Sequence, residues 1–191
     1  PKLTASWMEA LNRPESDMQR MAAETIARGH DHGVPGLDEA VLRLEQILLD
    51  ELSHPAARYA AARALIVLES RPSSDKLFTA SQAYGSDLRQ LIEPALATWD
   101  SAPAREVWIE RLAAEDASRR DLILAMRGLG ELGESAALPS LLSIAGDLTR
   151  NPDVRLDAAT AAGMIAPFVG ITDPTVAPRP KWTSGITARC E

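Results

Sequence analysis

The sequence predicts an all-α protein made of helical hairpins packed side by side. Apolar residues recur at helical spacing along the whole chain, prolines and glycines interrupt them at short intervals, and one pattern returns in alternate helices. The 191 residues are 46% apolar but only 4% aromatic, which suits closely packed helices better than a β-sandwich. No stretch shows the sustained alternation that a half-buried strand needs.

Apolar stripes and punctuation place the helices in order along the chain. Stripes with three- and four-residue steps fall in 38–52, 58–68 and 138–148. Ser6 and Glu9 can form a capping box for the first helix, and Asn151 can cap the last one. Prolines fit the first turn of a helix because its amides have no helical partner, and glycines fit its end. These markers are Pro14, Pro55, Pro72, Pro103 and Pro152 for starts, and Gly29, Gly85 and Gly133 for ends or turns.

A weak internal repeat lies in the second helix of each hairpin. It reads Asp-x-Arg, followed by small or apolar residues three, four, six and seven positions after the arginine. Glu93 and Arg127 are mismatches within it, and Ala61 and Ala62 are expected to be buried at a close helix–helix contact. In chain order, the arginine position falls at Gln19, Arg58, Arg89, Arg120 and Arg155.

This pattern resembles the HEAT-type (HEAT-like) α-helical repeat family over roughly 1–166. The resemblance implies a right-handed α-solenoid, an α–α superhelix with an armadillo-like fold, of about five hairpins. Variable spacing argues against the fixed 34-residue tetratricopeptide repeat, and an irregular helical bundle is the remaining alternative. The expected repeats cover 3–36, 37–70, 71–101, 102–134 and 135–166, and a Pro-rich, non-helical tail or the start of a following region covers 167–191. By the same resemblance, a structural Asp/Arg ladder would link the repeats through Arg58, Asp87, Arg89, Arg120, Asp153 and Arg155.

Composition and motifs argue against several classes of function. The net charge is −7, opposite to that of a dispersed nucleic-acid binder, and the single Cys190 excludes an intramolecular disulfide or a cysteine metal cluster. His30 and His32 read as part of a solvated loop rather than a metal site. We therefore expect no enzyme, metal or cofactor. No signal peptide or membrane-spanning run is present in this segment, so the compartment stays unknown, with the cytoplasm as default.

The leading hypothesis is a non-catalytic protein–protein interaction scaffold, part of a larger protein, that uses a concave solenoid surface. Positions one and five residues after the arginine position should face outward there. Their mixed charge suits a protein or peptide partner of unknown identity. An enzyme-accessory or tetrapyrrole-handling protein resembling phycobilin lyases is the alternative, followed by a nucleic-acid-binding HEAT-like repair protein. Trp99 and Trp108 are expected to pack, and Trp182 to cover the last repeat. The possible partner-binding residues are Arg20, Glu24, Tyr59, Arg63, Gln90, Asp121 and Thr160.

Overall fold

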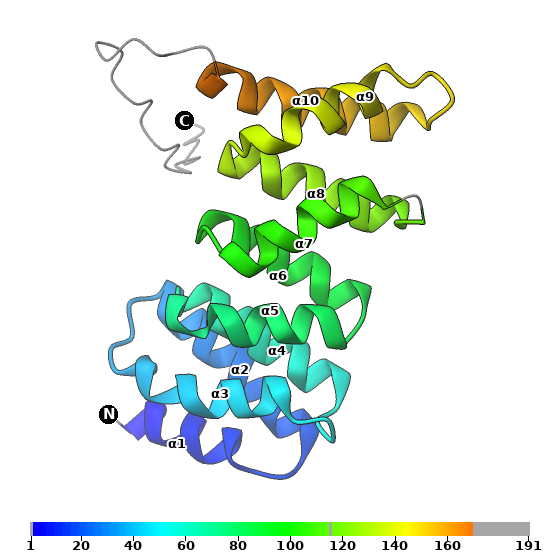
Figure 1. Ribbon diagram of the computed structural model, residues 1–191. Coiled ribbons are helices and arrows are strands. Elements are labelled where there is room, and N and C mark those ends of the chain that lie inside the picture. The colour runs from blue at the N-terminus through cyan, green and yellow to red at the C-terminus, as the bar shows by residue number, and fades with distance from the viewer. Residues whose placement is uncertain (1, 115, 170–191) are drawn as a thin grey trace, which may run out of the picture.

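The computed structural model describes residues 2–114 and 116–169, which contain ten α-helices, three short 3-10 turns and no strand. The helices follow one another in a single stack that begins at α1 and ends at α9 and α10 (Figure 1). The predicted all-α class is confirmed. The helices are α1 (Lys2–Leu11), α2 (Ser16–Asp31), α3 (Val41–Leu49), α4 (Pro55–Val67), α5 (Ser74–Ala83), α6 (Ser86–Thr98), α7 (Ala102–Ala113), α8 (Arg119–Leu132), α9 (Leu138–Gly146) and α10 (Pro152–Val169).

Helices pack in consecutive pairs, and the pairs contact one another through helices of the same kind. Each even-numbered helix packs against the odd-numbered helix before it. Along the stack, α2 contacts α4, α4 contacts α6, α6 contacts α8 and α8 contacts α10. The odd-numbered helices form a second series, in which α3 contacts α5, α5 contacts α7 and α7 contacts α9. The core is therefore extended along the stack, because each helix buries its apolar side against its neighbours.

Most of the predicted helix boundaries are confirmed, and two are wrong. Pro55 and Pro152 begin α4 and α10, and the Asn151 side chain accepts a hydrogen bond of 2.9 Å from the Asp153 amide. Ser6 lies inside α1, which starts at Lys2, so it is not an N-cap. Gly29 lies inside α2 rather than at its end. A Cβ there would come within 2.9 Å of the Trp7 ring. The glycine is needed for packing, not for a turn.

In α8 the structure places the start of the repeated sequence pattern at a different residue from the predicted one. The fourth residue of each even-numbered helix is Gln19, Arg58, Arg89, Leu122 or Arg155, at spacings of 39, 31, 33 and 33 residues. We call this the register residue. Counted from Leu122, the third, fourth, sixth and seventh residues are all buried, whereas the predicted start at Arg120 includes the exposed Arg127. Arg120 is wrong because Ser118 caps α8 and places Leu122, not Arg120, in the fourth position.

The turns that end α4, α6 and α8 share one conformation and confirm this register. The eleventh residue after the register residue is Glu69, Asp100 or Gly133, with φ of 50°, 58° and 67°. In each turn the next amide donates 3.0 Å to a carbonyl five residues earlier, as in a Schellman motif. Three successive turns therefore leave their helices in the same local geometry.

Small side chains let the helices approach closely. Ala61 and Ala62 are both 0% exposed, which confirms their predicted burial. In α8, a Cβ on Gly130 would lie 3.1 Å from Ala161 of α10. The last helix continues to Val169, three residues beyond the expected end of the array at 166. The predicted tail, including Trp182 and Cys190, otherwise lies outside the described residues.

Candidate functional site

Four of the five register residues, all except the apolar Leu122, donate hydrogen bonds to carbonyls at or just after the end of the preceding odd-numbered helix. The buried Arg58 donates hydrogen bonds to the carbonyls of Asp50 (2.8 Å) and Ser53 (3.2 Å), and its guanidinium stacks 3.7 Å from the Tyr84 ring centroid. Arg89 donates to the Ser81 carbonyl and Arg155 to the Ala145 carbonyl. Gln19 does the same with the Arg13 carbonyl, so an amide can replace the arginine. This contact holds the two helices of one pair together.

Ion pairs between neighbouring even-numbered helices form a separate set. They join α6 to α8 and α8 to α10. Most of these pairs include a residue that the predicted Asp/Arg ladder does not contain. Asp87 lies 3.8 Å from Arg120, and Arg89 pairs with Asp121 at 2.7 Å. The pairs to α10 are Arg119 with Asp153 and Arg127 with Asp157.

Asp121 takes part in packing between helices. The sequence places it on the outward face, whereas the structure places it between Arg89 and the Ser118 hydroxyl. Burial of the Asp121 carboxyl opposes its ionisation. The hydrogen bond and positive charge of Arg89, together with the hydrogen bond from Ser118, outweigh this effect, so the pKa of Asp121 is lowered. With the register residue at Leu122, the outward positions of α8 are Ile123 and Arg127 instead.

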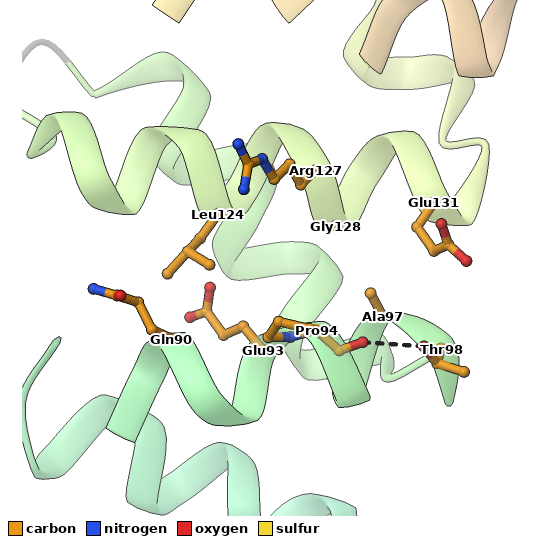
Figure 2. Close-up of a pocket in the computed structure, with 9 residues that line it drawn as sticks. All are labelled: Gln90, Glu93, Pro94, Ala97, Thr98, Leu124, Arg127, Gly128 and Glu131. Atoms are coloured by element: carbon orange, nitrogen blue, oxygen red, sulfur yellow. Dashed lines mark hydrogen bonds between the residues drawn. The ribbon is translucent and has the colours of Figure 1, made fainter. Parts of the chain in front are cut away.

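Two hollows lie next to each other on the side formed by α4, α6 and α8. We call this side the even-helix face. The first hollow, of about 570 Å³, is lined by Tyr59 of α4 and by Asp87, Gln90 and Leu91 of α6. The second, of about 500 Å³, lies between α6 and α8 and also includes Gln90. Figure 2 shows Gln90, Pro94 and Thr98 on one side of the second hollow and Leu124, Arg127 and Glu131 on the other.

Small or unusual residues make room for the second hollow. Pro94 lies inside α6 and has no amide hydrogen, so the Gln90 carbonyl lacks its usual donor four residues later. Ala97 and Gly128 line the same hollow with little side-chain volume. Packing in the core also requires a glycine at position 128, because a Cβ there would lie 2.7 Å from the ring of Trp108.

Glu93 is a buried carboxylate beneath this hollow. It is 1% exposed, and its Oε2 accepts hydrogen bonds from Trp108 Nε1 (3.0 Å) and Arg111 Nη1 (2.8 Å). Burial raises the pKa of Glu93, and the charge and hydrogen bond of Arg111 only partly offset this effect. Glu93 was not among the site residues predicted from the sequence. The available signal was its charge, four residues after Arg89, at a position of the repeat that is otherwise small or apolar.

The other predicted partner-binding residues differ in whether their side chains already have a partner within the chain. Arg20 pairs with Glu24 at 2.9 Å on α2, and the Thr160 hydroxyl donates to the Leu156 carbonyl on α10. Tyr59 is 43% exposed at the first hollow. Arg63 is exposed one turn further along α4, and no side-chain partner contacts it among the described residues. Tyr59 and Arg63 are therefore the predicted residues most available to a partner, whereas the Gln90 amide oxygen accepts a hydrogen bond of 2.9 Å from Arg120 Nε.

Two of the histidines and two of the tryptophans lie within helices or directly after them. His30 lies in the last turn of α2 and His32 follows it, with Nδ1 2.7 Å from the Arg28 carbonyl oxygen. Trp108 is buried and Trp99 half-buried against the core. Within residues 2–114 and 116–169, no three His, Cys, Asp or Glu residues are grouped as metal ligands, and no helix is long and apolar enough to span a membrane.

Comparison with known proteins adds no relative. No protein-family model matches the chain, and no curated protein sequence matches it.

Proposed function

We propose that the chain is a non-catalytic protein–protein interaction scaffold of the HEAT-like type, acting as part of a larger protein. In this proposal the helix pairs form about five repeats of a right-handed solenoid, and the even-helix face is its concave surface. The recurring register residue, the shared turns after α4, α6 and α8, and the contacts between like helices support it. The partner is a protein or a peptide.

The observation that carries this proposal is the pair of adjacent hollows. They share Gln90, so a single extended ligand could contact both without leaving the face. An exposed tyrosine lies at the first hollow and aliphatic Leu124 lines the second, and such apolar surface beside polar groups is typical of protein interfaces.

The charges on this face favour a protein over a nucleic acid. Arg20 is paired with an acid on its own helix, and Arg120 and Arg127 are paired with acids on neighbouring helices. A polyanion would have to displace those acids, whereas its affinity depends on available positive charge. Arg63 is the exposed cation of α4 that such a pair does not occupy.

The test is capture of partners from a lysate of the source organism, with and without nuclease. The chain and the double variant Tyr59→Ala/Arg63→Ala serve as bait, and mass spectrometry identifies the bound proteins. We expect a discrete protein that survives nuclease and is at least ten-fold depleted by the double variant. Loss of both side chains leaves the helices intact, since both are exposed.

The matched control changes the exposed Asp75 and Thr79 of α5, as Asp75→Ala/Thr79→Ala, and should retain the partner. Equal capture by all three baits would contradict the assignment of the face. A signal that disappears with nuclease would support the nucleic-acid alternative, and a coloured small molecule would support the tetrapyrrole alternative.

A further inference from the structure

One oxygen of the buried Glu93 carboxylate has no hydrogen-bond donor among the described residues. Oε2 accepts hydrogen bonds from Trp108 Nε1 at 3.0 Å and from Arg111 Nη1 at 2.8 Å. Arg111 Nη1 also lies 2.7 Å from Oε1, but Oε1 accepts no hydrogen bond from it or from any other described group. A buried polar atom without a hydrogen bond is costly and rare in a folded protein, so this oxygen calls for an explanation.

The Glu93 carboxylate lies at the hollow between α6 and α8. Glu93 is one of the residues that line this hollow, and Figure 2 shows its carboxylate directed from α6 towards Leu124 of α8. Trp108 and Arg111, the two donors to Oε2, both belong to α7 and do not line the hollow. A ligand in the hollow would therefore approach the carboxylate from the side of α8, away from the donors that are already in place.

The charges around this hollow favour a cation as the ligand. Glu131 is a second acid of its lining, is exposed, and has no side-chain partner among the described residues. Arg127 lines the hollow as well, but it is paired with Asp157 of α10 at 3.0 Å. Burial raises the pKa of Glu93 despite the charge of Arg111, so a further positive charge beside this carboxylate would be favourable. An anion would meet two acids, and an apolar group would leave Oε1 buried without a donor.

The lining of the hollow favours lysine over arginine. Pro94, Ala97 and Leu124 provide an apolar wall along which a chain of methylene groups can lie. Arginine binds a carboxylate best through two parallel hydrogen bonds, one to each oxygen, and Oε2 of Glu93 already has two donors. An ammonium group needs only the one oxygen that has none.

We propose that the hollow between α6 and α8 binds a lysine side chain of the partner protein, whose ammonium group donates a hydrogen bond to Oε1 of Glu93. The ammonium site follows from the lining of the hollow. Its occupation by a partner's lysine rests on the scaffold function proposed above. The two parts are tested by separate measurements.

The ammonium site is tested by following the indole N–H resonance of Trp108 by NMR while n-butylammonium chloride is added at constant ionic strength. This probe is a lysine side chain without its backbone, and Trp108 reports on its binding because Nε1 donates to Glu93. The resonance should shift until the site is saturated, whereas that of Trp7 on α1 should not move. The uncharged n-butanol should bind at least ten-fold more weakly.

The variant Glu93→Gln removes the negative charge but keeps an amide oxygen that accepts from Trp108. It should raise the dissociation constant of n-butylammonium at least ten-fold. The matched control Glu110→Gln removes an exposed charge of α7 and should bind the probe like the unaltered chain. Circular dichroism checks that both variants fold. The ammonium site is wrong if the Trp108 resonance of the unaltered chain does not respond, a result that depends on no variant. It is also wrong if the two variants bind the probe equally.

Capture from a nuclease-treated lysate tests the source of the lysine. As bait, Glu93→Gln should retain at most a tenth of the protein that the unaltered chain captures, and Glu110→Gln should retain all of it. Full capture by Glu93→Gln would contradict the lysine contact while supporting the scaffold function. Capture of no protein by the unaltered chain would instead contradict the scaffold function, and with it a partner as the source of the lysine.

Discussion

The contact between Gly128 and Trp108 connects core packing to the even-helix face. The Trp108 ring is buried, and its Nε1 donates to Glu93, so it cannot turn aside to admit another atom. Gly128 lies against that ring and lines the second hollow on its other side. The absence of a Cβ at this position therefore allows the Trp108 ring to lie where it does.

Gly128→Ala should destabilise the protein by about 1–3 kcal/mol, because the added methyl group overlaps the ring and overpacks the core. Chemical denaturation followed by circular dichroism measures the free energy of unfolding. Gly146→Ala is the control, since a Cβ there meets nothing within 4 Å, and it should stay within about 0.5 kcal/mol of the unaltered chain. Equal stability of the two variants would show that Trp108 is free to move.

Glu93 should give the stability of the protein a distinctive dependence on pH. Since burial raises its pKa in the folded state, the folded protein binds this proton more tightly than the unfolded chain does. Its contribution to stability is therefore largest below the ordinary glutamate pKa and is lost as the pH rises through the raised value. The opposite holds for Asp121, whose lowered pKa makes its contribution largest at higher pH.

The measurement compares the unfolding free energy of the unaltered chain and Glu93→Gln from neutral to acidic pH. The unaltered chain should gain stability relative to the variant as the pH falls towards 4.5, the ordinary value for this carboxyl. The exposed Glu110→Gln on α7 is the control and should lack this gain. The free energy of unfolding of the unaltered chain minus that of Glu93→Gln should not stay constant with pH. If this difference were constant, or if it grew as the pH rises, the pKa of Glu93 would not be raised.

At the scale of the helix, close packing depends on the register. Ala62 lies four residues after Arg58 on α4 and is 0% exposed in the core of the stack. Ala62→Leu should overpack this contact and destabilise the protein by about 1–3 kcal/mol. Ala56→Leu on the same helix is exposed and should change the stability by less than about 0.5 kcal/mol. If thermal or chemical unfolding gave both variants the same stability, the placement of α4 would be wrong.

The helices were predictable from the sequence because their signals are local. Apolar spacing, the prolines at Pro55 and Pro152 and the cap at Asn151 act within one or two turns. The register in α8 was not predictable in the same way, since Arg119 and Arg120 imitate the motif and only the cap at Ser118 decides where the helix begins. Gly29 was misassigned because its reason, the ring of Trp7, lies on another helix.

The candidate site was predictable only in part, for the same reason. Counting from the register identified Tyr59 and Gln90, both of which line hollows. It missed Arg127 because the predicted register in α8 began two residues too early. It could not identify Glu93, because the hollow between α6 and α8 depends on Pro94, Ala97 and Gly128 acting across two helices. Asp121 shows the reverse case, in which an apparent surface acid pairs with Arg89 of the neighbouring helix.

At the scale of the whole molecule, the even-helix face lies in the middle of the stack and carries the two hollows. Because helices contact mainly their neighbours, a change at either end of the stack should leave the hollows unaltered. Variants of this face can therefore be studied without disturbing the ends of the stack.

The most direct test of the proposed function is photo-crosslinking from Gln90, the residue that both hollows share. A photoreactive amino acid at this position, irradiated in a nuclease-treated lysate, should form a covalent adduct with a discrete protein. The same group at Thr79, exposed on α5, should not. A protein adduct from Gln90 alone is the predicted result. Adducts of equal yield from both positions, or none from Gln90, would contradict a protein-binding even-helix face.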